Sequence, residues 1–113
     1  MKAAPYAPAR GEIVWLQFTP QVGHEQSRRR PALIVSPVEY NRKVGLCLCC
    51  PVTGRVKGYP FEVELPPEVG VAGAVLCDQV KSLDWKARKA SLIAALPSPL
   101  IREVQTRIMA LIR

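Results

Sequence analysis

The sequence contains few of the residues on which many enzymes and membrane proteins depend. Aromatic residues make up 6% of the chain and histidine occurs once. The single histidine excludes a pair of histidines acting as acid and base within one chain. The longest stretch without a charged or strongly polar residue, 69–77, is far too short to span a membrane. The first residues form no apolar segment of the kind found in secretion signals, so we expect a cytoplasmic protein with no membrane role.

Several common site motifs are also missing. The chain has no G-x-x-x-x-G-K-[ST], no H-E-x-x-H and no G-x-S-x-G. Cys47, Cys49, Cys50 and Cys77 do not have the spacing of zinc ligands. Cys47 and Cys49 share one face of an expected strand and Cys50 lies on the other, which is typical of buried, reduced thiols. We therefore expect no metal and no cofactor.

The chain does carry enough apolar material for one core and an excess of positive charge. Its 113 residues are 49% hydrophobic, so we expect a single domain over 1–113, with 1–10 as a flexible N-terminal segment. The net charge is +7, and residues 1–57 hold nine basic and three acidic side chains. This imbalance indicates a polyanionic partner, either nucleic acid or an acidic protein tail, unless it serves only solubility.

Short apolar runs separated by glycine and proline predict a mainly β protein. The expected strands are 12–18, 32–35, 45–50, 61–65, 72–80 and 90–96, with Glu62 and Glu64 facing water. Loops are expected over 19–27 and 51–58, and a loop or helical turn over 37–44. From Ser98, an expected N-cap, the pattern becomes helical, with Pro99 in the first turn. The helix should pack an apolar stripe on the sheet: Leu100, Ile101, Val104, Ile108, Leu111 and Ile112. The pattern predicts a small barrel or curled sheet of five to six mostly antiparallel strands with a C-terminal helix.

Two segments could carry chemistry. Residues 23–31 place a carboxylate, an imidazole and three guanidinium groups before an expected buried strand. A guanidinium at the start of a rigid strand can bind two phosphate oxygens at once, although a solvated basic turn explains the same composition. Thr53 follows the 45–50 strand beside Arg55 and Lys57. Its hydroxyl could donate to a phosphoryl oxygen or cap a turn.

Ordered blocks of residues make the chain resemble a known family. They are Gly11–Trp15, Glu25–Gln26, Arg30–Ala32, Ser36–Pro37, Tyr40–Asn41, 57–63 and 78–82. In order and spacing they resemble the MazF/PemK toxin endoribonucleases of type II toxin–antitoxin pairs. The resemblance implies a homodimer with an SH3-like barrel of the CcdB/PemK type and a cognate acidic antitoxin as partner. It also implies metal-independent cleavage of single-stranded RNA by its own 2′-hydroxyl, leaving 2′,3′-cyclic phosphate and 5′-hydroxyl ends.

The resemblance also implies roles for individual residues. Arg30 and Thr53 stand at the family's catalytic arginine and threonine, and Glu25 at a supporting or basic glutamate. Glu25 is the better base, because an arginine stays protonated near neutral pH. A further group of polar and basic residues is expected to contact the RNA. The alternative is that they only make structural hydrogen bonds or lie in a solvated loop. They are His24, Gln26, Arg28, Arg29, Asn41, Arg55, Lys57, Gln79 and Lys81.

Two other functions remain open from the sequence. A non-catalytic gyrase poison of the CcdB type could use the same fold, although residues 108–113 contain no aromatic of the kind that family carries near its C-terminus. A basic module could also bind RNA without cutting it. The carboxylate of Glu25 close to Arg30 in sequence disfavours this second reading, since phosphate binding alone needs no acidic group.

Overall fold

The computed structural model describes residues 5–19 and 28–113, which fold mainly into seven antiparallel strands. The strands are β1 (Glu12–Thr19), β2 (Arg28–Ile34), β3 (Cys47–Thr53), β4 (Glu62–Glu64), β5 (Ala74–Leu76), β6 (Lys81–Leu83) and β7 (Ser91–Ala95). Helix α1 (Val38–Val44), the short 3-10 helix η1 (Pro67–Val69) and the C-terminal helix α2 (Ser98–Ile112) complete the fold.

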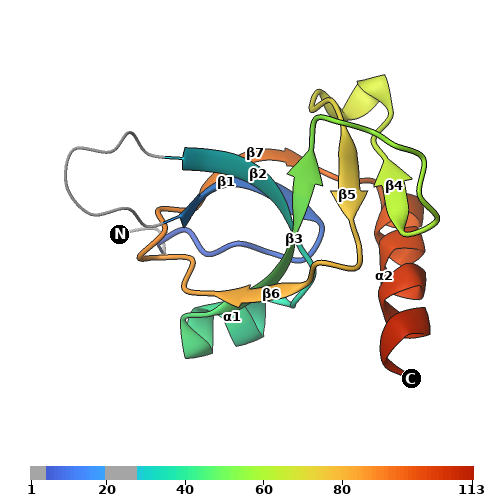
Figure 1. Cartoon of the computed structure of the whole chain (residues 1–113). Helices are drawn as coiled ribbons and strands as arrows, with labels where there is room; N and C mark the ends of the chain where they lie inside the picture. Colours follow the sequence, from blue (N-terminus) through green and yellow to red (C-terminus); the bar gives the residue numbers. More distant parts are fainter. Residues whose placement is uncertain (1–4, 20–27) are drawn as a thin grey trace.

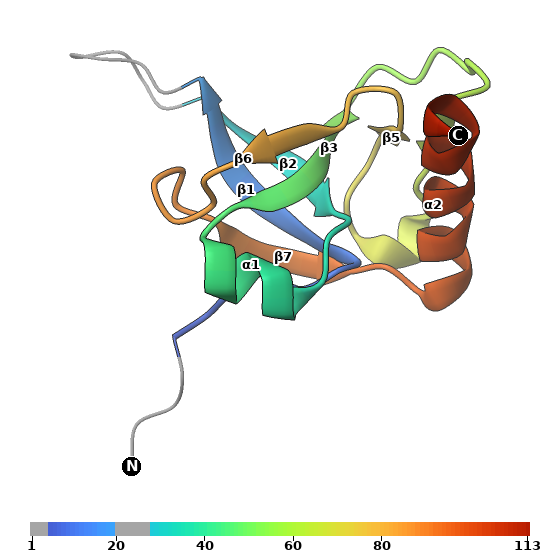
Figure 2. The ribbon, with the colours of Figure 1, turned by 90° about the horizontal axis from the view of Figure 1, so that it is seen from below.

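The strands form one strongly curled sheet that does not close into a barrel. Neighbouring strands follow the order β4-β5-β3-β2-β1-β7, and β6 also pairs with β3. Helix α2 stands beside β4 and β5, whereas α1 lies near β6, away from α2 (Figure 1, Figure 2). The mainly β prediction is confirmed, with an open sheet in place of a closed barrel.

Two strand predictions need correction. The expected strand over 72–80 is only the short strand β5, Ala74–Leu76; the chain leaves the strand at Cys77–Val80, and β6 follows where no strand was expected. β6 has only three residues, Lys81, Ser82 and Leu83, so periodicity alone does not reveal it; pairing with Cys47–Cys49 of β3 holds it in place. β3 also extends to Thr53, which was expected in a loop.

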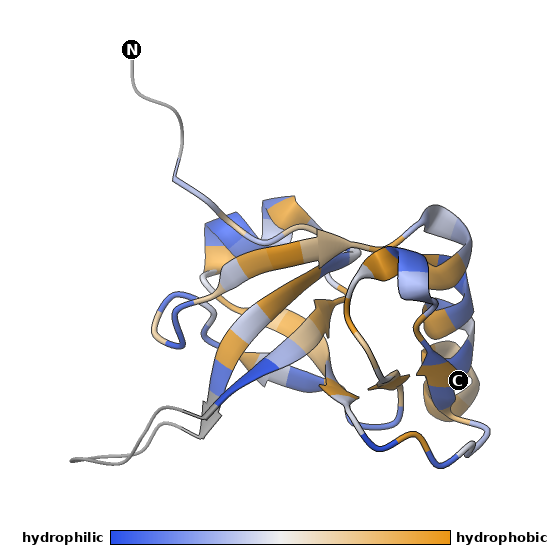
Figure 3. Ribbon diagram, turned by 90° about the horizontal axis from the view of Figure 1, so that it is seen from above, coloured by the Kyte–Doolittle hydropathy of each residue, from blue (hydrophilic) through white to orange (hydrophobic). Residues whose placement is uncertain are grey.

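Alternation along the central strands divides the core between the two faces of the sheet. Ile13, Leu33 and Cys50 are paired across three strands and belong to the cluster that Val104 of α2 covers. Val14 and Ala32 point the other way, into the cluster that contains Trp85. The curl of the sheet thus gives a small chain two hydrophobic clusters. Apolar residues recur along the strands that supply them (Figure 3).

Helix α2 differs from its prediction at both ends. Pro97 occupies the N-cap position and Ser98 is already helical. The carbonyl of Pro97 accepts the first hydrogen bonds of the helix, from the N–H groups of Leu100 and Ile101. The apolar stripe packs on the core as far as Ile108, but Leu111 and Ile112 are 59% and 72% exposed. Neither α helix in residues 5–19 and 28–113 combines the length and the hydropathy needed to cross a membrane.

The segment before β1 is packed rather than free over its described part. Ala7 and Pro8 are buried, and the Pro8 carbonyl accepts a hydrogen bond of 2.8 Å from Asn41 Nδ2. Asn41 is itself fully buried: it also donates to the Ser36 carbonyl, and its Oδ1 accepts from Ser36 Oγ. Its own carbonyl accepts from Trp85 Nε1. Asn41 thus ties residues 7 and 8 of the N-terminal segment to α1.

We expect Asn41→Ala to lower the free energy of unfolding by about 3 kcal/mol, because it leaves buried carbonyl groups of Pro8 and Ser36 without a donor. Urea unfolding followed by circular dichroism measures the change. Arg42→Ala, at the exposed neighbouring position of the same helix, is the matched control and should change stability by less than about 0.5 kcal/mol. Equal midpoints for the two variants would contradict the structural role of Asn41.

All four cysteines are free thiols in the core, as predicted. Burial raises the pKa of Cys50 to about 12 and that of Cys77 to about 11. Cys47 and Cys49 pack in the cluster on the opposite face from Cys50. At neutral pH, Cys50 and Cys77 therefore act as small apolar side chains. The described residues include no group of three or more potential metal ligands.

Candidate active site

The register of the sheet brings Arg30 and Thr53 together. β2 and β3 are antiparallel, with Ala32 opposite Pro51 and Leu33 opposite Cys50. The pairing stops at Ala32 and Pro51, and Arg30 and Thr53 each lie two residues beyond that pair, so strand alternation puts both on the same face of the sheet. Along this register every second residue donates to β3, as Val35 does to the Leu48 carbonyl. The next donor after Leu33 would be Pro31, which has no N–H, so the ladder ends there and the two strands are free to separate.

A cavity opens where the two strands separate. It has a volume of about 260 Å³, and Arg30 and Thr53 both line it. Its other lining residues are Pro51, Val52, Leu76, Gln79 and Lys81. We call this the Arg30–Thr53 cavity. It carries two cationic side chains, Arg30 and Lys81, and no carboxylate from a described residue, so it suits an anion.

Arg30 is exposed, and its side chain makes no hydrogen bond or ion pair with another described residue. β2 starts with three arginines and turns apolar after Pro31, a change visible along the strand in Figure 3. Pairing with Leu16 of β1 holds the Arg30 backbone in the sheet although its side chain reaches solvent. Arg30 therefore combines a fixed backbone with a guanidinium that is available to a ligand.

Thr53 is held by its neighbours on both sides. Its Oγ1 accepts a hydrogen bond of 3.1 Å from the backbone N–H of Arg55, which leaves the hydroxyl hydrogen for a ligand. Gly73 crosses directly over the Thr53 carbonyl, with φ +126°. A Cβ at position 73 would lie 2.1 Å from that carbonyl oxygen, so only glycine allows this approach.

A second cavity of about 210 Å³ adjoins the first, and we call it the Tyr59 cavity. The two share Thr53, Leu76 and Gln79. The second is lined in addition by aromatic and charged residues: Arg55, Lys57, Tyr59, Phe61, Glu62 and Asp78. The two cavities thus share one wall at the end of β3, and we call them together the groove.

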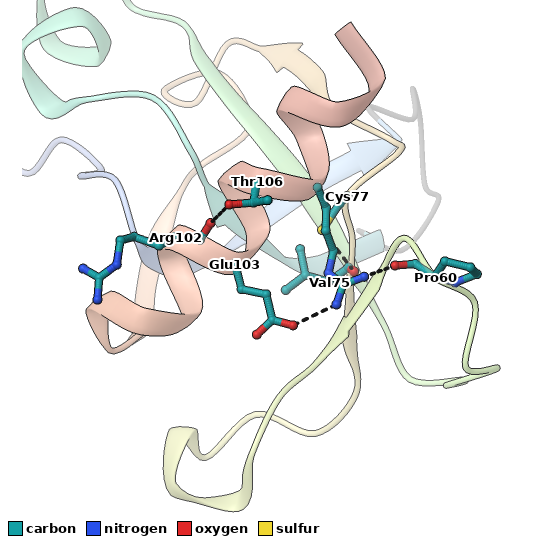
Figure 4. A network of polar contacts seen from close by, with 7 residues as sticks. Pro60, Val75, Cys77, Arg102, Glu103 and Thr106 are labelled. Carbon is teal, nitrogen blue, oxygen red and sulfur yellow. Dashed lines mark hydrogen bonds and ion pairs between the residues drawn. The ribbon is translucent and has the colours of Figure 1, made fainter. Parts of the chain in front are cut away.

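The chain segment along the Tyr59 cavity is fixed from two directions. The Glu62 carboxylate accepts hydrogen bonds from the backbone N–H groups of Lys57, at 3.0 Å, and Gly58, at 2.9 Å. Glu62 therefore does not simply face water, as its alternation suggested. Arg107 of α2 donates to the Pro60 carbonyl and pairs with Glu103 at 2.9 Å (Figure 4). Helix α2 thus braces the segment that presents Tyr59.

Some of the site residues predicted from the sequence lie in the two cavities and others do not. It brings Arg30, Thr53, Gln79 and Lys81 into one cavity, and Arg55 and Lys57 into the adjoining one. Arg29 points elsewhere, because its guanidinium binds the Lys89 carbonyl and Ser91 Oγ. Asn41 is buried in structural hydrogen bonds, so the structural alternative holds for it and an RNA contact does not.

The remaining predicted residues cannot be placed in the site. His24, Glu25 and Gln26 lie outside the described residues, and Arg28 opens β2 opposite Thr19. Three residues that line the groove were not predicted as site residues: Tyr59, Phe61 and Asp78. The signal was present: 57–63 and 78–82 are blocks of the family resemblance, and both are polar or aromatic where a buried strand would be apolar.

Comparisons with known proteins decide the family. Residues 9–112 match the family described as PemK-like, MazF-like toxin of type II toxin–antitoxin system. The chain belongs to the PemK/MazF toxin family. The MazF endoribonuclease toxin of Escherichia coli K12 is 42% identical over 107 residues, covering 95% of this chain and 96% of that protein. MazF of Deinococcus radiodurans is 52% identical in its crystal structure, with a TM-score of 0.86, covering 95% of this chain and 97% of that one.

A crystal structure of a MazE–MazF complex from D. radiodurans is equally similar. Its matching chain is 52% identical, with a TM-score of 0.88, and the alignment covers 95% of this chain and 96% of that one. The similarity to PemK/MazF proteins therefore extends over the whole curled sheet and α2. The match over 9–112 includes both cavities of the groove, so the site described above is part of the family's toxin domain.

Proposed function

We propose that this protein is the toxin of a type II toxin–antitoxin system and that it is a sequence-selective endoribonuclease of single-stranded RNA. One observation carries the proposal: Arg30 and Thr53 come from different strands and line one positively charged cavity in a chain of the PemK/MazF family. Single-stranded RNA suits an open groove, because its bases can leave the stack and be read at their edges.

The reaction needs no group beyond the RNA and the protein's side chains. The 2′-hydroxyl oxygen attacks the adjacent phosphorus, a new P–O2′ bond forms, and the P–O5′ bond breaks. The products are a 2′,3′-cyclic phosphate and a 5′-hydroxyl. The guanidinium of Arg30 binds the non-bridging phosphoryl oxygens as negative charge grows on them, and the Thr53 hydroxyl donates a further hydrogen bond.

Two protons must move during this reaction. One proton leaves the 2′-hydroxyl, and we propose that the Glu25 carboxylate accepts it. Near neutral pH a carboxylate is ionised and can take up a proton, whereas a guanidinium is already protonated. The other must reach the 5′-oxygen as it leaves. We assign that proton to the Arg30 guanidinium, which lines the cavity and would bind the same phosphate. The fixed backbones of Arg30 and Thr53 contribute by holding the phosphate in line for displacement.

The same groove suits the partners that the family implies. MazF forms a complex with MazE in the related D. radiodurans structure. For this chain we propose an acidic antitoxin segment that covers the groove and competes with RNA, drawn by the net charge of +7. We also propose a cytoplasmic homodimer built from a single toxin domain. The exposed apolar residues Met109, Leu111 and Ile112 at the end of α2 are candidates for its interface.

The test uses the purified protein and a mixed-sequence single-stranded RNA in the presence of EDTA. We expect discrete fragments whose cut sites share a short sequence, and complete protection when the acidic antitoxin is added first. RNA that is bound but recovered intact would contradict the nuclease and favour a binding module. RNA that is neither bound nor cut would leave the gyrase poison, which DNA supercoiling by gyrase would then test.

A further inference from the structure

We propose that the Tyr59 cavity binds the base next to the cleaved phosphate, with Tyr59 as its stacking surface and Asp78 as a specificity-determining residue that selects bases with an exocyclic amino group. The inference rests on the proposed nuclease function and deepens it. It concerns Tyr59, Phe61 and Asp78, which line the groove but have no part in the chemistry above.

The two cavities differ in charge. The Arg30–Thr53 cavity has two cations and no carboxylate among its described lining residues, which suits the phosphate. The Tyr59 cavity has two cations, Arg55 and Lys57, balanced by Glu62 and Asp78. A site with as many carboxylates as cations offers little net attraction to a second phosphate. It suits a neutral, polar group instead, and a nucleotide carries such a group, its base, beside each phosphate.

The cavity also has a flat surface for that base. Tyr59 is 48% exposed, and its ring lies 5.4 Å from that of Phe61, at an angle of 34°. Lys57 Nζ stands 5.9 Å from the centre of the Tyr59 ring. Glu62 and Arg107 hold the segment on both sides of Tyr59, so little freedom is lost when a base stacks there. An exposed, braced aromatic ring in a groove is the usual platform for single-stranded RNA.

Selection among bases follows from which polar groups are still available. Glu62 already accepts two backbone N–H groups through one oxygen. The Asp78 carboxylate is exposed and has no hydrogen-bond or ion-pair partner among the described residues. A carboxylate only accepts hydrogen bonds, so it favours the amino groups of adenine, cytosine and guanine and disfavours the carbonyl edge of uracil. Gln79, on the wall shared with the phosphate cavity, can both donate and accept.

The experiment compares the wild type with Asp78→Asn, Tyr59→Ala and Tyr59→Phe on a short RNA with one cut site identified from the mixed-sequence digest. In a second RNA, the amino-bearing base next to the cut loses only its amino group: adenine becomes purine, cytosine 2-pyrimidinone or guanine hypoxanthine. We expect the wild type to prefer the first RNA by about fivefold or more, and Asp78→Asn to lose most of this preference. Tyr59→Ala should raise KM by roughly five- to 150-fold with little change in kcat, and Tyr59→Phe, which keeps the ring, should recover most of the lost affinity.

Binding of a fluorescein-labelled copy of the same RNA, followed by anisotropy, separates failure of the subsite from failure of the nuclease. If the wild type cuts RNA but neither variant changes KM, affinity or base preference, the subsite is overturned and the nuclease stands. If the mixed-sequence RNA is bound but not cut, labelled oligo(A) and oligo(U) replace the cut-site RNA in the anisotropy measurement. A preference for oligo(A) that Asp78→Asn loses, with weaker binding by Tyr59→Ala, would mean that the nuclease is wrong and the base subsite stands. If the RNA is not bound at all, both are overturned.

Discussion

Arg30→Ala should abolish RNA cleavage, with a loss of at least about 10³-fold in kcat/KM, while the protein stays folded. The expected size is that of losing an arginine that stabilises a phosphoryl-transfer transition state. Arg30 is exposed and bonded to no other described side chain, so its removal leaves no buried group unsatisfied. The measurement is the rate of cleavage of a fluorogenic RNA containing one cut site, beside a urea unfolding curve for each protein.

Two further variants separate the geometry of Arg30 from its charge. Arg30→Lys keeps the charge but loses the paired N–H groups, so it should recover only part of the lost activity. Arg102→Ala removes an equal charge from an exposed position on α2 outside both cavities, and should retain nearly full activity. An Arg30→Ala protein that is folded and active would remove Arg30 from the mechanism.

Thr53→Val should lower kcat by about 10²- to 10³-fold, the usual loss when one hydrogen-bond donor to a developing oxyanion is removed. Valine keeps the shape of threonine but can neither donate to the phosphoryl oxygen nor accept from the Arg55 N–H. The lost turn contact is exposed and should cost only about 1 kcal/mol of stability. Single-turnover cleavage at saturating protein measures the chemical step without the contribution of binding.

The control for this prediction is Thr53→Ser, which keeps the hydroxyl and both of its hydrogen bonds. It should stay within about tenfold of the wild type, since only a methyl group is lost. Equal losses in the valine and serine variants would show that the methyl group, through packing, matters as much as the hydroxyl. That result would contradict the proposed role of Thr53.

Much of the fold could be predicted from the sequence because its signals are local. β1, β7 and α2 follow from apolar periodicity, and the division of the cysteines between two faces follows from strand alternation. β6 could not be predicted, since Lys81, Ser82 and Leu83 are held in a strand only by β3. The early start of β2 has the same cause. Three consecutive arginines predict a solvated turn, but in the structure they form a strand because β1 pairs with them.

The sequence predicts some of the residues that form the site, but not how the fold arranges them. Arg30 and Thr53 were predicted from family motifs, but their common cavity depends on the β2–β3 register and on where that ladder ends. Asn41 stands in a family block and looked like a polar contact residue, and only burial against Pro8 and Ser36 reveals its structural role. Tyr59 becomes a site residue only through Glu62 and Arg107, which are distant or inconspicuous in sequence.

The central claim is that Arg30 and Thr53 act on a phosphate attacked by the neighbouring 2′-hydroxyl. Analysis of the ends of the RNA fragments by mass spectrometry tests it most directly, with digestion in EDTA by the wild type and by Arg30→Ala. We predict 2′,3′-cyclic phosphate and 5′-hydroxyl ends from the wild type, and none from the folded variant. Fragments with 3′-hydroxyl and 5′-phosphate ends would mean that water attacks the phosphorus, and would contradict the mechanism.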